Sequence, residues 1–291
     1  MKIWPDCIPC ILKMSLGVAR VAMKDEDRVR RFMEGVLRLK YLNGKNQKVT
    51  SPDVIRAVWS KVIEVTGEAD PLRKVKEEQN RKALATYPRA KALVLKSKDP
   101  FLGAVKLSIA ANSIDAMTDV KGEAPEEIIK KWNRLEIDRK LVHVFKERVK
   151  KSRKVGYLGD NCGEIVFDKL FIEVLLERYP VNITYVTRTL PIVNDATLRD
   201  ALVMGMGEVA QIMENGVPEH LPGTFLKRID SELKKLIERS DLVISKGGGN
   251  YDSLTEEEKL KGKTSFLFLA KCFPYCHLHR VSLNAPVIYN F

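Results

Sequence analysis

Long apolar runs are absent from this chain of 291 residues. No run approaches the roughly 18 residues that a membrane-spanning helix requires. The opening segment, MKIWPDCIPCILKMSLGVAR, places Pro, Asp and Lys where a signal peptide needs an unbroken apolar stretch. We therefore predict a cytoplasmic protein without membrane contact.

Cysteine is also scarce, and the five residues are too few and too unevenly spaced for a secreted disulfide framework. Cys7 and Cys10 lie near one end of the chain, Cys272 and Cys276 near the other, and Cys162 in between. The two outer pairs could share a structural zinc ion. They could also form disulfides if the source is a hyperthermophile, or remain free buried thiols. Scarce glutamine and abundant charge fit a heat-adapted source.

Acidic residues are too few in the first half of the chain to balance the basic ones. Residues 1–150 contain 32 Lys and Arg against 20 Asp and Glu, whereas residues 151–291 contain 18 of each. The whole net charge of +12 therefore lies in the first half. Such a surface could attract nucleic acid or an anionic substrate, or could be a solvated, salt-bridged helical surface. No RNA-binding signature is present, so we expect no nucleic-acid partner.

The hydrophobic period changes near residue 151. Before this point apolar residues recur at three- and four-residue spacing, which predicts a helical domain over residues 1–150. After it, short apolar runs alternate with helical segments, which predicts an α/β/α sandwich with a mainly parallel sheet over residues 151–291. The fold class is therefore α/β, with a helical N-terminal part. The expected strands are residues 155–160, 182–187, 241–246 and 264–270, with an edge strand at 285–291.

Polar residues gather where three of the expected strands end. Ligands of parallel sheets bind at these carboxyl ends, beside a topological switch point. Asp and Asn oxygens suit Mg²⁺, Mn²⁺ or a similar ion, and lysine beside glycine amides suits an anion. Each group alone is more often a helix cap or a turn. Together they indicate phosphoryl chemistry, with a metal that neutralises charge and activates water. The groups are Asp160-Asn161, Asn194-Asp195 and Lys246-Gly247-Gly248-Gly249.

Several sharper motifs are missing. GKT at 262–264 lacks the upstream glycine of a phosphate-binding loop, and GGGN lacks the spacing of a dinucleotide site. There is no G-x-S-x-G elbow, and the four histidines form no zinc-enzyme motif. No S-adenosylmethionine motif is present either.

Six ordered blocks resemble one family over nearly the whole chain. The sequence is similar to the metal-dependent damage-control phosphatases, and within them to the short-chain prokaryotic and archaeal subgroup. The resemblance implies hydrolysis of small phosphorylated metabolites, such as sugar phosphates or damaged and surplus cofactor precursors. The alternatives are a methyltransferase-like protein, a non-catalytic metal-binding protein, or a basic nucleic-acid-binding module. The blocks are CIPCIL, ADPLRKVKEEQN, AVKLSIAANSID, GDNCGEIVFD, PIVNDAT and KGGGNYDSL.

The resemblance also implies roles for individual residues. Metal ligands would be Asp160, Asn161 and Asp195, for Mn, Ni, Co or Mg, and the catalytic residues would be Asp160, Asp195 and Lys246. Lys246 matches the family's phosphate-contacting lysine, and the adjoining Gly247, Gly248, Gly249 and Asn250 would complete the phosphate site. Asn112 and Asp115 match a block that lines the cleft, and their spacing would place them on one helical face. The chain departs from the family pattern at Ala111, where Gly is usual, and at Gly248, where Gln or Met is usual.

Overall fold

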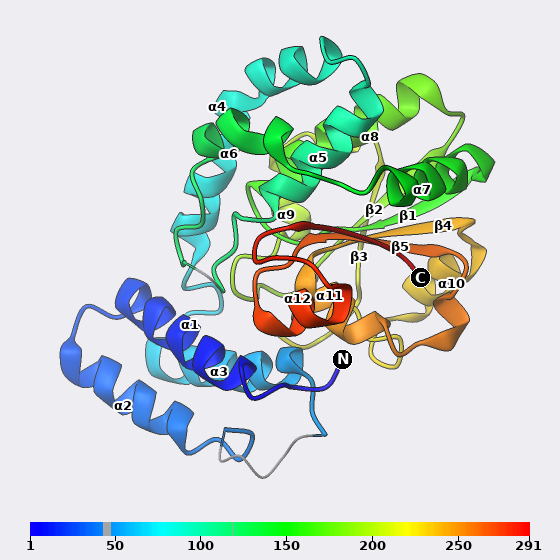
Figure 1. Cartoon of the computed structure of the whole chain (residues 1–291). Coiled ribbons are helices and arrows are strands. Elements are labelled where there is room, and N and C mark those ends of the chain that lie inside the picture. Colours follow the sequence, from blue (N-terminus) through cyan, green and yellow to red (C-terminus); the bar gives the residue numbers. More distant parts are fainter. Residues whose placement is uncertain (43–47, 118) are drawn as a thin grey trace.

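A six-stranded sheet forms the centre of the second half of the chain. The computed structural model describes residues 1–42, 48–117 and 119–291 (Figure 1). The strand order is β3-β2-β1-β4-β5-β6, with β1 to β5 parallel and β6 antiparallel to β5. The predicted α/β class with a mainly parallel sheet is confirmed. The strands are β1 (Lys154–Leu158), β2 (Asn182–Thr187), β3 (Gln211–Glu214), β4 (Leu242–Lys246), β5 (Thr264–Leu269) and β6 (Pro286–Asn290).

Helices make up the first half and alternate with strands in the second. In the first half they are α1 (Cys7–Ala22), α2 (Glu26–Leu37), α3 (Ser51–Thr66), α4 (Arg73–Leu95), α5 (Pro100–Ala111), α6 (Pro125–Lys131), η1 (Trp132–Arg134) and α7 (Arg139–Lys151). In the second half they are α8 (Glu164–Arg178), α9 (Leu198–Val203), η2 (Met206–Glu208), α10 (Ser231–Arg239), α11 (Gly247–Leu254), η3 (Glu258–Leu260) and α12 (Phe273–His279).

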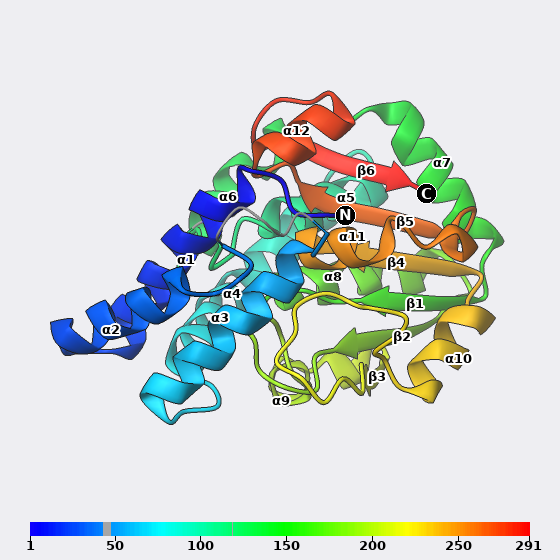
Figure 2. The same cartoon turned by 90° about the horizontal axis from the view of Figure 1, so that it is seen from below.

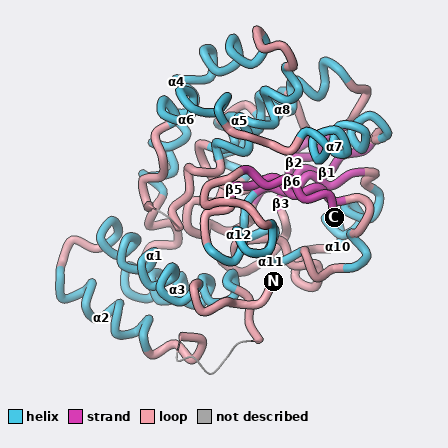
Figure 3. Tube along the Cα trace, in the orientation of Figure 1, coloured by secondary structure: helices cyan, strands magenta, loops and turns pink. Residues whose placement is uncertain are grey.

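The sheet is covered on both faces, which makes three layers. Helices α4 to α8 lie over one face and α10 to α12 over the other (Figures 1 and 2). Alternate strand residues serve the two faces, because successive side chains of a strand point in opposite directions. Tyr157 and Leu267 pack into the core under α5 and α8, whereas Leu158 and Phe266 pack into the core above α10 and α11. Figure 3 shows the strands enclosed between these helical layers.

The first half of the chain does not form a single packed unit. Helices α1 to α3 have their own hydrophobic core, which includes Val18, Phe32 and Trp59. The side chains of Phe101 from α5 and Phe145 from α7 instead pack in the core of the sandwich. Residue 151 therefore marks the start of the sheet region, and the division into a helical domain (1–150) and a metal-binding catalytic domain (151–291) stays a prediction.

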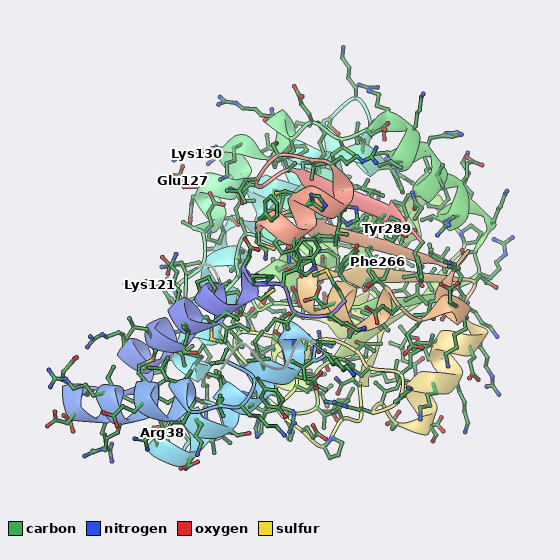
Figure 4. The ribbon with its side chains drawn as sticks, turned by 60° about the horizontal axis from the view of Figure 1, so that its bottom comes forward. Arg38, Lys121, Glu127, Lys130, Phe266 and Tyr289 are labelled. Atoms are coloured by element: carbon green, nitrogen blue, oxygen red, sulfur yellow. The ribbon has the colours of Figure 1, made fainter. Side chains whose placement is uncertain are left out.

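The edges of the sheet differ in how well they could be predicted. Strand β6 is the edge strand expected at the C-terminal end, and Tyr289 stacks on Phe266 of β5 with ring centroids 6.1 Å apart (Figure 4). Strand β3 was not predicted, because its residues are only partly buried and form no continuous apolar run.

Charge pairs cover the helical surface of the first half. Lys130 and Glu127 on α6 lie 2.5 Å apart (Figure 4), and similar pairs join Arg73 to Glu77 and Arg81 to Glu78. Several basic residues of this surface are therefore paired with acidic neighbours. No helix in the described ranges is both long enough and apolar enough to cross a bilayer.

Candidate functional site

The strand order reverses between β1 and β4. Strand β1 pairs with β2 on one side and with β4 on the other, so consecutive connections leave in opposite directions. Asp160 and Asn161 follow β1 at this point, and Lys246 ends β4 beside them. The predicted groups thus lie at the switch point where doubly wound sheets bind ligands.

Backbone hydrogen bonds hold the loops after β1 and β2 together. Asn161 and Asp195 form an isolated antiparallel bridge. The Cys162 N–H donates to the Asn194 carbonyl at 2.8 Å, and the Ala196 N–H donates to the Asp160 carbonyl at 2.8 Å. The three predicted metal ligands are thereby brought to one place.

A cavity of about 120 Å³ opens above these three residues. Asp115, Gly248 and Gly249 from the predicted set also line it, together with side chains of α1 and α3 such as Ile11 and Ile55. The small helical unit of α1 to α3 therefore closes one side of the pocket. Within the described residues, the lining does not include Asn112, Lys246, Gly247 or Asn250.

The Asn161 amide is fixed by two carboxylates. Its Nδ2 donates to Asp160 Oδ2 at 2.7 Å and to Glu164 Oε2 at 3.0 Å. Because both N–H groups are used in this way, the carbonyl oxygen is directed away from these carboxylates. Asn161 lines the cavity, and its carbonyl oxygen is a hard donor of the kind that divalent ions prefer.

Arg188, at the end of β2, was not predicted as a site residue. Its Nε donates to Asp195 Oδ2 at 2.6 Å, and Nη2 donates to Asn250 Oδ1 at 3.1 Å. Nη1 donates to the Gly223 carbonyl at 2.9 Å, and the side chain is 2% exposed. Arg188 therefore holds the orientation of Asp195 from below the pocket. A charged residue closing a buried strand is the sequence signal that could have identified it.

Lys246 lies beneath the pocket rather than at its surface. Its Nζ donates to Glu164 Oε1 at 2.6 Å, to Asp168 Oδ1 at 2.7 Å and to the Ser108 carbonyl at 3.0 Å. The side chains of Lys246, Glu164 and Asp168 are all 0% exposed. Lys246 is therefore the counter-ion of Glu164 and Asp168 on α8. Its contact with phosphate stays a prediction.

Gly247 has no room for a side chain. Its φ is +76°, and an added Cβ would meet Asp160 Oδ2 at 1.8 Å. Only glycine adopts this backbone conformation readily. The glycine therefore allows α11 to begin directly against the Asp160 carboxylate.

Asn250 and Asn112 are buried supports of the site. Asn250 Nδ2 donates to the Gly159 carbonyl at 3.0 Å and to the Lys246 carbonyl at 2.8 Å. Asn112 Nδ2 donates to Asp160 Oδ2 at 3.2 Å and to Glu164 Oε2 at 3.0 Å. The expected shared helical face of Asn112 and Asp115 is wrong, because α5 ends at Ala111 and Asp115 lies in the irregular segment that follows it.

Lys271, two residues after β5, lines the pocket and was not predicted. It pairs with Asp115 and donates to the Asn112 carbonyl at 2.8 Å. Burial lowers the pKa of Lys271, but Asp115, Asp160 and Glu164 outweigh this effect and raise it. The amine is therefore a stable cation at the pocket wall.

Negative charge is concentrated at the ligand loops. Burial raises the pKa of Asp160 well above its ordinary value, and Asp195 and Glu164 raise it further. Burial also raises the pKa of Asp195, against the effect of Arg188. A bound cation would relieve both the burial cost and the repulsion.

The His, Cys, Asp and Glu side chains of the described residues do not form a metal site by themselves. Among the described residues, no group of three or more His, Cys, Asp and Glu side chains could hold a metal ion. The predicted set contains two carboxylates, with one carboxamide as the third oxygen donor. The oxygen donors fit a hard divalent ion that keeps water ligands.

All five cysteines are free thiols. Cys7, Cys10 and Cys272 line the same cavity as Asp160, and burial raises the pKa of Cys7 to about 11 and that of Cys272 to about 12. Cys162 is fully buried under the ligand loop. The sequence left open a shared zinc ion, disulfides or free thiols, and the cysteines of the structure are free.

A doubly wound sheet with acidic and amide side chains at its switch point defines an α/β enzyme or ligand-binding protein. Residues 3–286 match the family described as the damage-control phosphatase ARMT1-like domain, and the chain belongs to this family. The family predicted from the sequence blocks is confirmed.

Individual relatives agree with this assignment. The chain is 33% identical over 278 residues to a damage-control phosphatase of Archaeoglobus fulgidus, covering 94% of each chain. It is 29% identical to a damage-control phosphatase of Pyrococcus horikoshii, covering 94% of this chain and 92% of that one. A crystal structure of a DUF89 family protein from Pyrococcus horikoshii matches the whole of both chains with a TM-score of 0.86 at 26% identity. The family supports a phosphatase role.

Proposed function

We propose that this protein is a metal-dependent phosphomonoester hydrolase that acts on small phosphorylated metabolites as part of metabolite repair. The observation that carries the proposal is the meeting of Asp160, Asn161 and Asp195 at one pocket beside the start of α11. Sugar phosphates and damaged or surplus cofactor precursors are the proposed substrates. We also propose that the protein works in the cytoplasm, without a nucleic-acid partner.

Asp160, Asn161 and Asp195 would hold the metal, with Mn, Ni, Co and Mg as candidates. When bound, such an ion supplies charge neutralisation for phosphoryl oxygens and lowers the pKa of a coordinated water. Glu164 and Arg188 support this arrangement, because Glu164 orients the Asn161 amide and Arg188 orients the Asp195 carboxylate. Asp160 or Asp195 would orient the attacking water.

The part of the pocket formed by the start of α11 and Lys271 suits an anion. The first N–H groups of a helix have no intrahelical acceptor and carry a partial positive charge. Gly248 and Gly249, in the first turn of α11, line the pocket, and the Lys271 amine adds a full charge. We propose that these groups bind the phosphoryl oxygens. The contact of Lys246 with Glu164 supports a role in fixing that carboxylate. We propose separately that Lys246 contacts a phosphoryl oxygen of the substrate.

A chelation experiment tests the proposed function. We expect the purified protein to release phosphate from 4-nitrophenyl phosphate, because small aryl phosphates present the same phosphoryl group as the proposed substrates. Chelation should reduce the rate to background, and Mn²⁺, Co²⁺, Ni²⁺ or Mg²⁺ should restore it. A panel of phosphorylated metabolites would then identify the substrate.

Two other outcomes would count against the proposal. Phosphate release that persists after complete metal removal would contradict metal dependence. Salt-sensitive retention on nucleic acid without phosphatase activity would favour the basic binding module instead.

Substituting Gly247 tests the contact between α11 and Asp160. Gly247→Ala should lower the free energy of unfolding by about 1–2 kcal/mol through its left-handed φ. Displacement of Asp160 by the new Cβ should also slow phosphate release by about 10²-fold. Urea unfolding and steady-state rates would measure the two effects.

Gly262→Ala is the matched control. Gly262 has a φ of +82°, yet an added Cβ would meet nothing within 4 Å. It should show the backbone cost alone, with normal turnover. Equal turnover in the two variants would show that the close approach to Asp160 has no catalytic consequence.

A further inference from the structure

Helix α4 carries a buried polar stripe that the proposed chemistry does not use. Lys76, Gln79 and Asn80 are 2%, 5% and 4% exposed. They belong to the ADPLRKVKEEQN block, yet no residue of α4 is among the described residues that line the pocket. Buried polar side chains need hydrogen-bond partners, so the partners of these three residues show which segments of the protein they hold in place.

Asn80 connects the loop after β1 with the start of α9. Its Oδ1 accepts from the Gly163 N–H at 2.6 Å, and its Nδ2 donates to Asp200 Oδ1 at 3.1 Å. Asp200 in turn accepts from the Thr197 N–H at 2.9 Å and from its hydroxyl at 2.7 Å. Gly163 lies two residues after Asn161, and Thr197 two residues after Asp195. One amide thus bridges both ligand loops.

Gln79 makes a second connection. Its Oε1 accepts from Asn194 Nδ2 at 3.2 Å, and its Nε2 donates to the Lys121 carbonyl at 3.2 Å. Asn194 also donates to the Ile114 carbonyl at 3.1 Å and accepts from the Ala116 N–H at 3.1 Å. The loop that carries Asp195 is thereby fixed to the segment that carries Asp115.

Lys76 supplies the charge that this network requires. Its Nζ lies 2.7 Å from Asp70 Oδ2 and 3.7 Å from Asp200 Oδ2. A buried carboxylate without a counter-ion is costly, so Lys76 allows Asp200 to remain a charged acceptor inside the protein.

We propose that Asn80 is a positioning residue, which fixes the loop of Asp160 and Asn161 relative to the loop of Asp195. The proposal rests on the proposed function, because the groups it positions are the metal ligands assigned there. Partners behind metal ligands set ligand geometry, and their loss typically lowers metal affinity by about 10- to 100-fold. Asn80 should therefore affect metal affinity and kcat more than KM.

The variants alter the hydrogen bond between Asn80 and Asp200, first at Asn80 alone and then at both residues. Asn80→Asp keeps the acceptor for Gly163 but places two carboxylates together, and should weaken Mn²⁺ binding by about 10- to 100-fold. The double variant Asn80→Asp with Asp200→Asn restores a donor and acceptor pair with the same total charge, so it should recover most of the affinity. Glu78→Gln is the control and should bind Mn²⁺ normally, because Glu78 is exposed and pairs with Arg81 and Lys82 of the same helix.

Three measurements distinguish the outcomes. Titration calorimetry gives the Mn²⁺ affinity, steady-state hydrolysis of 4-nitrophenyl phosphate separates kcat from KM, and thermal unfolding shows that each variant is folded. Recovery of Mn²⁺ affinity and kcat in the double variant supports the proposal. A folded Asn80→Asp variant with normal Mn²⁺ affinity overturns it, as does a double variant that stays as impaired as the single one.

Hydrogen exchange of the metal-free protein separates this inference from the proposed function. Asn80→Ala should raise exchange about tenfold or more in peptides covering residues 160–164 and 194–198, because the amide that joins the loops is gone. If the wild-type protein binds no Mn²⁺, the proposed function fails, and faster exchange still supports positioning of the loops. Unchanged exchange in both peptides overturns the positioning role, whatever the wild-type activity.

Discussion

Replacing Asp160 with alanine should abolish divalent metal binding and reduce phosphate release by about 10³-fold or more, while the protein stays folded. Asp160 lies against several other parts of the site, among them the Gly247 backbone at the start of α11. It lines the pocket, and it accepts hydrogen bonds from Asn112 and Asn161. Its loss removes an oxygen ligand and a negative charge together.

The fold should tolerate this change for two reasons. Asn112 and Asn161 each donate a second hydrogen bond to Glu164, so each amide keeps one of its two hydrogen bonds. Burial and the neighbouring Asp195 and Glu164 raise the pKa of Asp160, so the charged carboxylate is itself unfavourable in the metal-free protein. Metal content by mass spectrometry, phosphate release and thermal unfolding would measure the three effects.

Asp241→Ala provides a control at the opposite edge of the sheet, where Asp241 precedes β4. The Asp241 carboxylate accepts from the N–H groups of Arg153 and Lys154 at 2.8 and 2.9 Å, far from the pocket in the strand direction. This variant should keep its metal and its activity. An Asp160→Ala protein that retains its metal would show that the ligand assignment is wrong.

The position of the site could be predicted because it depends on strand ends. Asp160 and Asn161 follow one apolar run, and Asp195 follows the loop after the next. Parallel strands bring such residues to one edge of the sheet, whatever the details of packing. The same rule could have identified Arg188 and Lys271, which lie one and two residues after the ends of β2 and β5.

The partners of buried charges could not be predicted in the same way. Glu164 and Asp168 are four residues apart on α8 and face the same direction, a spacing equally typical of an exposed helix. Their meeting with Lys246 depends on how α8 packs on β4, which only tertiary structure defines. The division of the first half, with α1 to α3 over the pocket and α4 to α7 over the sheet, depends on packing for the same reason.

Lys246→Ala should destabilise the protein by about 3–5 kcal/mol, because it leaves Glu164 and Asp168 as buried carboxylates without a counter-ion. Metal affinity should fall as well, since Glu164 would no longer be held where it orients the Asn161 amide. A phosphate contact alone predicts a different result: unchanged stability and metal affinity, with kcat/KM reduced by about 10²-fold or more. Urea unfolding, Mn²⁺ titration and steady-state kinetics distinguish the two.

Two further variants make the Lys246 result specific. Lys246→Met combined with Asp168→Asn removes one positive and one negative charge, so it should recover part of the stability that Lys246→Ala loses. Lys271→Ala, at the pocket wall, should instead lower kcat/KM, because its amine lies where a phosphoryl group would bind. A Lys246→Ala protein that unfolds at the wild-type urea concentration but turns over slowly would favour the direct phosphate contact. In that case Lys246 must leave Glu164 and Asp168 when substrate binds. The two buried ion pairs would then exist only in the substrate-free protein.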